Sequence, residues 1–154
     1  PDIFTAGKAM GGGFPIGVVI MKRDIGECLV PGEHGSTFGG NPLACAAIIG
    51  SIRTLLEDNV VEQAKVKGEI LSKMLNEELS NLRIVRRIKG LALMIGIELR
   101  KQPQKVIPSL QNMGLLVSKA GLTTIRLLPP YLISKENISW SIRVIKDAIS
   151  KHYG

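Results

Sequence analysis

The apolar residues of the chain repeat with a helical spacing in two long stretches. The first series runs from residue 61 to residue 82 and comprises Val61, Ala64, Gly68, Leu71, Leu75, Leu79 and Leu82. Intervals of three and four residues place such a series on one face of a helix. The second series, Ile138, Ile142, Ile145 and Ile149, follows Ser134, whose hydroxyl can cap a first helical turn. We expect both helices to cover a hydrophobic core.

Between these helices the apolar period shortens to two, which is the period of a half-buried strand. The residues Leu93, Ile95, Ile97 and Leu99 alternate onto one face of a strand predicted over residues 91–99. Further strands are predicted over 84–88, 115–118 and 124–128, with a helix over 104–113 between the second and third strands of the four. A long helix, a small sheet and covering helices predict an α+β unit over residues 59–154.

The first 58 residues are rich in glycine and proline and contain one obvious strand, the continuous apolar run from Ile16 to Met21. Asn41-Pro42 predicts a helix start, because asparagine accepts a hydrogen bond from a free N–H and proline at the first helical position loses none. The helix is expected to run to about residue 58. Since it is apolar nearly all round at its start, we expect it to be mostly buried in part of a larger α/β domain.

The composition is that of a globular protein, because 45% of the 154 residues are hydrophobic and 21% are charged. No apolar run reaches the roughly 18 residues of a membrane span, and no signal segment is evident, so we expect a cytoplasmic protein with no membrane partner. Cys28 and Cys45 lack the spacing of a zinc site and are too few for a disulfide scaffold, so both are expected to be small buried residues. His34 is interpreted as a turn residue, because only His152 could join it and no metal-binding spacing exists, so we expect no metal.

The formal net charge of +7 raises the question of an anionic partner. The basic residues are spread along the chain and aromatic residues make up 4% of it, so no nucleic-acid partner is expected. The densest basic group, Arg83, Arg86, Arg87 and Lys89, is interpreted as a solvated strand edge.

Lys8 precedes a run of three glycines in the segment T-A-G-K-A-M-G-G-G-F-P-I-G. A phosphate-binding P-loop has its lysine after the glycines and follows it with Ser or Thr, so this segment is not one. No other charged residue lies between Asp2 and Lys22. An amine in weakly solvating surroundings keeps more of its neutral, nucleophilic form and can form a Schiff base. The alternative is a solvent-exposed loop lysine.

For two further groups of residues the sequence allows both a binding role and a purely structural one. Ser36 and Thr37 place two hydroxyls in a glycine-rich stretch just before the helix at Asn41, which is either an anion-binding loop or a simple turn with a cap. Arg126 lies between apolar residues of a predicted strand, just before Pro129-Pro130. A buried arginine needs a carboxylate or phosphate, so it either closes an internal ion pair or binds an acidic ligand.

Together these segments resemble the class III (acetylornithine/ornithine-type) aminotransferases, which use pyridoxal 5'-phosphate on the fold-type-I scaffold. The lysine segment is similar to the family's cofactor-lysine segment, H-G-S-T-F-G-G-N-P-L-A-C-A-A to the glycine-rich segment after it, and I-R-L-L-P-P to the substrate-arginine strand. The resemblance covers the whole chain as the C-terminal portion of a subunit. It implies an α/β fold with part of the large cofactor-binding domain over residues 1–58 and the small C-terminal α+β domain over 59–154.

The resemblance implies a role for each candidate residue. Lys8 would hold the cofactor covalently and then serve as the catalytic base. Ser36 and Thr37 would bind the cofactor phosphate, with Thr37 acting in the site of the neighbouring subunit of a homodimer, and Arg126 would bind the substrate α-carboxylate. The implied reaction moves an amino group from N-acetylornithine or a similar acylated ornithine or lysine to 2-oxoglutarate, in arginine or lysine biosynthesis.

In that family the phosphate loop, the aromatic that stacks on the cofactor ring and the aspartate that bonds the ring nitrogen all precede the lysine segment. The chain begins at Pro1 without a methionine, so we expect it to be a piece of a longer subunit and inactive alone. The alternative from another functional class is a non-catalytic dimerisation or interaction module derived from the same fold.

Overall fold

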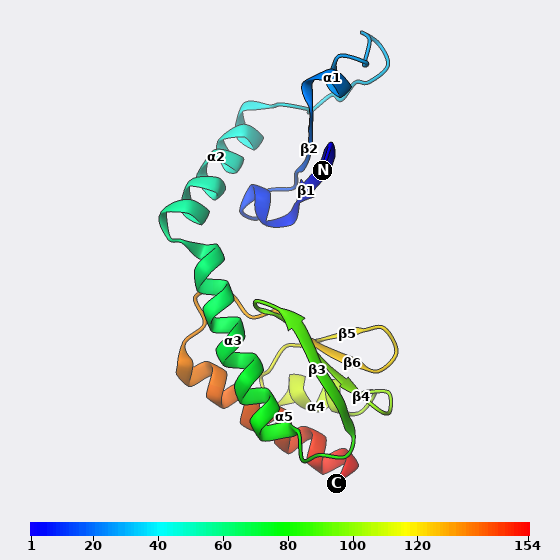
Figure 1. The fold of residues 1–154 in the computed structure, drawn as a ribbon, viewed down its shortest axis with the longest axis vertical. Helices are drawn as coiled ribbons and strands as arrows, with labels where there is room; N and C mark the ends of the chain where they lie inside the picture. The colour runs from blue at the N-terminus through cyan, green and yellow to red at the C-terminus, as the bar shows by residue number, and fades with distance from the viewer. The chain divides into compact units, whose positions relative to one another are not determined.

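The computed structural model describes residues 1–154 and divides them into two units, Pro1–Val60 and Val61–Gly154 (Figure 1). None of their helices combines the length and the apolar character needed to cross a bilayer.

The second unit is built on a four-stranded antiparallel sheet in the order β3-β4-β6-β5. Its strands are β3 (Val85–Leu91), β4 (Met94–Leu99), β5 (Ser118–Ala120) and β6 (Thr124–Leu127). The predicted alternation is confirmed, because Leu93, Ile95, Ile97 and Leu99 are all buried. The third predicted strand begins three residues later than expected, since Leu115 to Val117 lead into β5 without pairing.

Three helices complete this unit: α3 (Val60–Leu79), α4 (Val106–Asn112) and α5 (Lys135–Tyr153). Ser134 caps α5 as predicted, its Oγ accepting a hydrogen bond from the Asn137 backbone N–H at 3.2 Å. The apolar faces of α3 and α5 close over the sheet, and the largest fully buried side chains are Leu71, Leu75, Leu79, Ile95, Ile97, Leu99, Leu110, Ile125, Ile138, Ile142, Ile145 and Ile149. Val61 is exposed, contrary to its place in the apolar series, because it precedes the part of α3 that contacts this core.

The first unit consists of a two-stranded ribbon, one long helix and short helical turns. Its strands β1 (Ile3–Gly7) and β2 (Gly17–Met21) pair antiparallel, with Ile3 opposite Met21 and Gly7 opposite Gly17. A 3-10 turn, η1 (Lys8–Gly11), joins the strands, and α1 (Arg23–Gly26) and α2 (Pro42–Glu57) follow. The predicted helix start is confirmed, because Asn41 Oδ1 accepts from the Ala44 N–H at 2.9 Å. The strand β1 was not predicted, since its five residues show no alternation.

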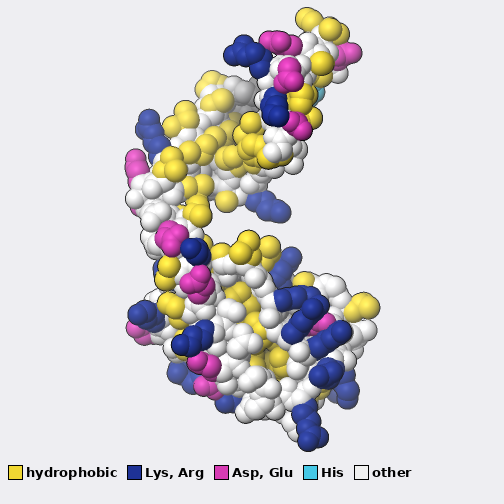
Figure 2. All heavy atoms as spheres, viewed as in Figure 1, with side chains coloured by type: hydrophobic (Ala, Val, Ile, Leu, Met, Phe, Trp, Pro, Cys, Tyr) yellow, Lys and Arg dark blue, Asp and Glu magenta, His cyan; other side chains and the backbone are white.

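The expectation that this helix is mostly buried is wrong for the described chain. In residues 1–60 only Gly11, Ala44 and Val60 are buried. The physical reason is that one helix and a two-stranded ribbon present more apolar surface than they can cover for each other. Figure 2 shows hydrophobic side chains gathered over this unit, and the exposed set includes Phe4, Val19, Phe38, Leu43, Ile49, Ile52 and Leu56.

The two cysteines follow the same pattern. Both Cys28 and Cys45 are exposed and free, which corrects the expectation of buried residues. Each thiol lies near a backbone carbonyl of its own segment, at 3.3 Å for Cys28 and 3.6 Å for Cys45, and neither contributes to a core.

Candidate functional site

Lys8 occupies a backbone conformation that is uncommon for a residue with a side chain. It lies where β1 passes into η1, with φ of 54°. Such left-handed conformations cost energy outside glycine and cluster at functional sites. The side chain is exposed, and its amine makes no hydrogen bond or ion pair within the chain. In this chain Lys8 is therefore a solvent-exposed loop lysine, and its amine is free to react.

Two of the three glycines after this lysine, Gly11 and Gly12, let the turn pack closely. A Cβ on Gly11 would lie 2.8 Å from Ile16 Cγ2, and a Cβ on Gly12 would lie 2.6 Å from Ser51 Oγ on α2. Gly12 also has φ of 57°, in the left-handed region. Because glycine alone tolerates this approach, the run fixes the turn that carries Lys8 against α2.

Ser36 and Thr37 lie in an exposed loop that ends at the N-terminus of α2. None of the backbone N–H groups of residues 34–38 donates a hydrogen bond within the chain. Asn41 ties the end of this loop to the helix, with Nδ2 donating to the Phe38 carbonyl at 2.8 Å. Free N–H groups, two hydroxyls and the positive end of a helix dipole form a set of groups suited to an anion such as a phosphate.

An open cleft of about 540 Å³ lies beside this loop. Its walls come from residues 14–17, which follow the lysine turn, from Ser36, from residues 38–41 and from Ala44. Neither Lys8 nor Thr37 lines it. The structure therefore brings Ser36 to the turn after the lysine but joins neither hydroxyl to the lysine amine.

Arg126 lies in β6, where its apolar neighbours Ile125 and Leu127 are buried in the core. Its own side chain is half-buried, on the opposite face of the sheet, and its Nε donates to Ser118 Oγ at 3.1 Å. No carboxylate of the chain pairs with it. The internal ion pair that the sequence left open is therefore absent, and the terminal nitrogens are available to an acidic ligand.

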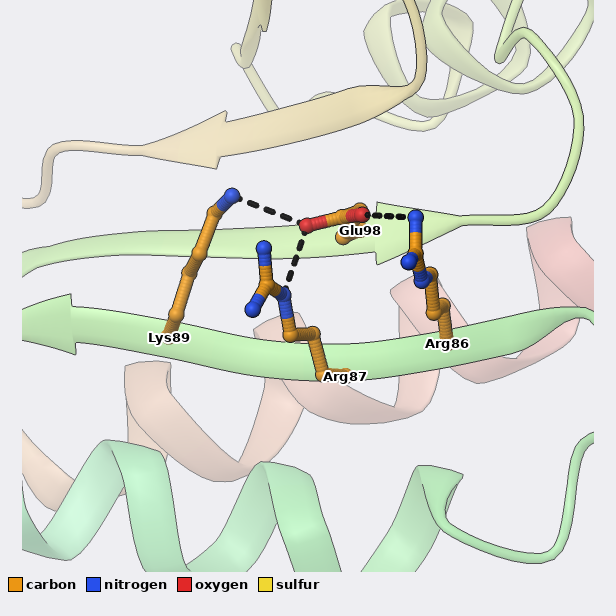
Figure 3. A network of polar contacts seen from close by, with 4 residues as sticks. All are labelled: Arg86, Arg87, Lys89 and Glu98. Atoms are coloured by element: carbon orange, nitrogen blue, oxygen red, sulfur yellow. Dashed lines mark hydrogen bonds and ion pairs between the residues drawn. The ribbon is translucent and has the colours of Figure 1, made fainter.

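Glu98 forms a polar centre that sequence reasoning missed. Its side chain is 8% exposed and accepts hydrogen bonds from the three cations Arg86, Arg87 and Lys89 at 3.0, 2.8 and 2.8 Å (Figure 3). The hydrogen bonds from Lys89 and Arg87 lower the pKa of Glu98 from 4.5 to about 2. The sequence signal was available, because Glu98, like Arg126, is a charge inside an apolar strand.

The interpretation of the basic group as a solvated strand edge is confirmed, because β3 is an edge strand of the sheet and the side chains of Arg86, Arg87 and Lys89 are each at least half exposed. These three cations also hold a buried carboxylate. The pairing of β3 with β4 shifts register between Val85 and Arg87, and both Arg86 and Arg87 reach Glu98 across this irregularity.

Strand register places Arg126 on the same sheet face as this centre. Arg87 pairs with Glu98 and Lys89 with Gly96 across β3 and β4, and Gly96 pairs in turn with Arg126 on β6. Paired residues, and residues two apart along a strand, share a face. The face opposite the core therefore carries several cations and the single carboxylate of Glu98, which favours an anionic ligand.

Known proteins resemble this chain over nearly its whole length. A family model described as aminotransferase class-III matches residues 1–149. The chain is 48% identical, over 98% of its length, to a [LysW]-aminoadipate semialdehyde/glutamate semialdehyde transaminase of Sulfolobus acidocaldarius, of which it covers 39%. It is 42% identical, over 99% of its length, to an acetylornithine aminotransferase of Bacillus subtilis, again covering 39% of that protein.

Solved structures agree with these matches. A structure of ornithine delta-aminotransferase from Plasmodium falciparum superposes with a TM-score of 0.93 at 31% identity, covering 99% of this chain and 41% of that one. An acetylornithine aminotransferase of Elizabethkingia anophelis superposes with a TM-score of 0.90 at 29% identity, covering 98% of this chain and 41% of that one. The chain thus spans about two fifths of the length of the proteins it matches.

Proposed function

Because the chain belongs to the class-III aminotransferase family, we propose that it forms the C-terminal part of an aminotransferase subunit in arginine or lysine biosynthesis. The amino donor would be N-acetylornithine or a similar acylated ornithine or lysine, and the acceptor 2-oxoglutarate. The names of two relatives support this substrate class, since one is an acetylornithine aminotransferase and the other is a transaminase of [LysW]-linked semialdehydes, the aldehydes into which terminal amines are converted by transamination. Residues 1–58 would belong to the large cofactor-binding domain and 59–154 to the small one.

The family's cofactor is pyridoxal phosphate, and the residues present fit it. Lys8 offers an unpartnered amine, and the loop around Ser36 and Thr37 offers two hydroxyls and unpaired backbone N–H groups for a phosphate. When bound, the cofactor supplies an electron-withdrawing ring that stabilises negative charge on the carbon beside the substrate's amino group.

Lys8 would perform two tasks in this reaction. Its Nζ would hold the cofactor covalently until the substrate amine displaces it. The freed amine would then accept a proton from the substrate carbon that bears the reacting amino group and return it to the cofactor carbon joined to that nitrogen, because a flexible side chain fixed at a rigid turn stays within reach of both carbons. The observation that carries this proposal is the free Lys8 amine at a left-handed backbone position inside the segment that the family match covers.

Ser36 and Thr37 would bind the phosphate through their hydroxyls and the neighbouring N–H groups. We propose that Thr37 does so in the partner subunit's site of a homodimer. The separation of this loop from the lysine amine within the chain supports that arrangement.

Arg126 would bind the substrate α-carboxylate. An arginine that is half-buried and lacks an internal carboxylate keeps its two terminal nitrogens free for a bidentate pair. The positive face of the sheet around it would also favour an acidic substrate.

The proposal is tested by trapping. The complete enzyme is incubated with pyridoxal phosphate, reduced with borohydride and digested, and the labelled peptide is identified by mass spectrometry. We expect one stable label per chain, on Lys8, and an unchanged label in a Lys22→Ala control. A label confined to other lysines would overturn the assignment of Lys8. If the protein were instead a non-catalytic interaction module, no lysine would carry a stoichiometric cofactor label.

A further inference from the structure

Arg126 is held from one side only, by a residue on the edge strand of the sheet. Ser118 lies directly opposite Arg126 in the register of β5 with β6, and Gly96 lies opposite it on β4. Directly paired residues of an antiparallel sheet point to the same face. Arg126 therefore has a hydroxyl beside it toward the edge of the sheet and no side chain beside it toward the centre.

The hydrogen bond to Ser118 uses one particular nitrogen of the guanidinium. It is Nε that donates to Ser118 Oγ, at 3.1 Å. A guanidinium has five N–H groups, one on Nε and four on the two terminal nitrogens. A carboxylate can bind it side-on, through Nε and one terminal nitrogen, or end-on, through both terminal nitrogens. Because Ser118 engages Nε, the end-on mode remains.

The terminal nitrogens have no competing partner in the chain. Glu98 is the buried carboxylate on the same face, and its oxygens are already bonded to Arg86, Arg87 and Lys89. Arg126 itself pairs with no acidic residue. The guanidinium is thus oriented by one hydrogen bond while the end that binds an anion stays free.

We propose that Ser118 is a positioning residue that sets Arg126 for end-on, bidentate binding of the substrate carboxylate. The proposal rests on the substrate-binding role of Arg126 argued above and adds the binding mode and the residue that determines it. An arginine side chain has many rotamers, and ordering it at the moment of binding costs free energy. Ser118 orders it beforehand, so the benefit appears in carboxylate affinity rather than in the proton-transfer step.

The test uses the complete, cofactor-loaded enzyme with Ser118→Ala and Ser118→Thr. Affinity is measured by calorimetry with glutarate, a dicarboxylate that carries no reacting group, and steady-state constants are measured with 2-oxoglutarate as the amino acceptor. We expect Ser118→Ala to raise both the Kd for glutarate and the KM for the acceptor about three- to tenfold, which corresponds to the loss of one ordinary intramolecular hydrogen bond. The kcat should change less than about twofold.

Two variants serve as matched comparisons. Ser118→Thr retains the hydroxyl and should keep Kd and KM within about twofold of wild type. Lys119→Gln alters the next residue of β5, whose side chain lies on the opposite face, and should leave both constants near wild type. A wild-type Kd and KM in Ser118→Ala, or an equal defect in Ser118→Thr, would overturn the positioning role.

Arg126→Ala separates this inference from the proposed function. Loss of glutarate binding in Arg126→Ala together with wild-type binding in Ser118→Ala would refute the positioning role alone. Wild-type binding in Arg126→Ala would refute the substrate-binding role of Arg126, and with it the inference built on that role.

Discussion

At the scale of single residues, two charged side chains inside apolar strands, Arg126 and Glu98, form the polar contacts on the sheet face away from the core. Arg126 and Glu98 each lie between two buried apolar residues of their strands, and each lies on the sheet face away from the core. The sequence shows that such a residue needs partners but does not identify them, because the partners lie on other strands. Arg126 is left without a carboxylate, whereas Glu98 takes three cations.

The pKa of Glu98 makes a prediction about acid stability. Because its pKa is about 2 in the folded chain against an ordinary value of 4.5, the ionised carboxylate stabilises the fold at pH above about 4.5. That stabilisation is lost as the pH falls from about 4.5 to about 2. Glu98→Gln should therefore lower the free energy of unfolding at pH 7, and its difference from wild type should shrink over that interval.

Urea unfolding at a series of pH values measures this difference, with the fluorescence of the single tryptophan, Trp140, reporting on the second unit. The control is Glu78→Gln, which removes an exposed ion pair with Lys146 and should have a much smaller effect. Profiles for wild type and Glu98→Gln that stay parallel from pH 7 to pH 2 would contradict the account.

At the scale of elements, periodicity was a good guide where an element packs within its own unit. The helices α3 and α5 and the strand β4 were predicted, because their apolar faces meet inside the second unit. The strand β1 and the exposure of α2 were not predicted from the sequence. Five residues without alternation carry no strand signal, and the burial of an apolar helix depends on which surfaces lie next to it.

Two glycines at helix interiors should respond in opposite ways to the same substitution. Gly68 of α3 packs against the turn between β3 and β4, where an added Cβ would lie 2.1 Å from the Ala92 carbonyl oxygen. A backbone atom cannot move aside cheaply, so Gly68→Ala should destabilise the second unit by about 1–3 kcal/mol or more. Gly50 of α2 has no atom within 4 Å of an added Cβ. Gly50→Ala should stabilise its helix by about 0.5–1 kcal/mol.

Urea unfolding followed by Trp140 fluorescence measures the first effect, and far-ultraviolet circular dichroism follows the helix content that responds to the second. Comparing Gly68→Ala with Gly50→Ala is informative because helix propensity favours alanine at both positions, so opposite signs isolate the effect of the close backbone contact at Gly68. A stabilising Gly68→Ala would show that α3 does not approach the turn as closely as described.

At the scale of the whole molecule, the residues to which roles are proposed lie far apart along the chain. Lys8, Ser36 and Thr37 belong to the first unit and Arg126 to the second. Their residue types and order along the chain were enough to indicate the family, which the match over residues 1–149 bears out. The Glu98 centre and the bond from Ser118 to Arg126 could not be predicted in this way, because both depend on strand register rather than on a motif.

The central claim is that the amine of Lys8 carries out the chemistry of transamination, and the most direct test is turnover of the complete enzyme with Lys8→Ala. We predict that kcat/KM falls by at least about a thousandfold, since the covalent and proton-transfer roles are lost together. Lys22→Ala, in the same unit and exposed, should retain wild-type turnover. Undiminished turnover in a folded, cofactor-loaded Lys8→Ala enzyme would contradict the account.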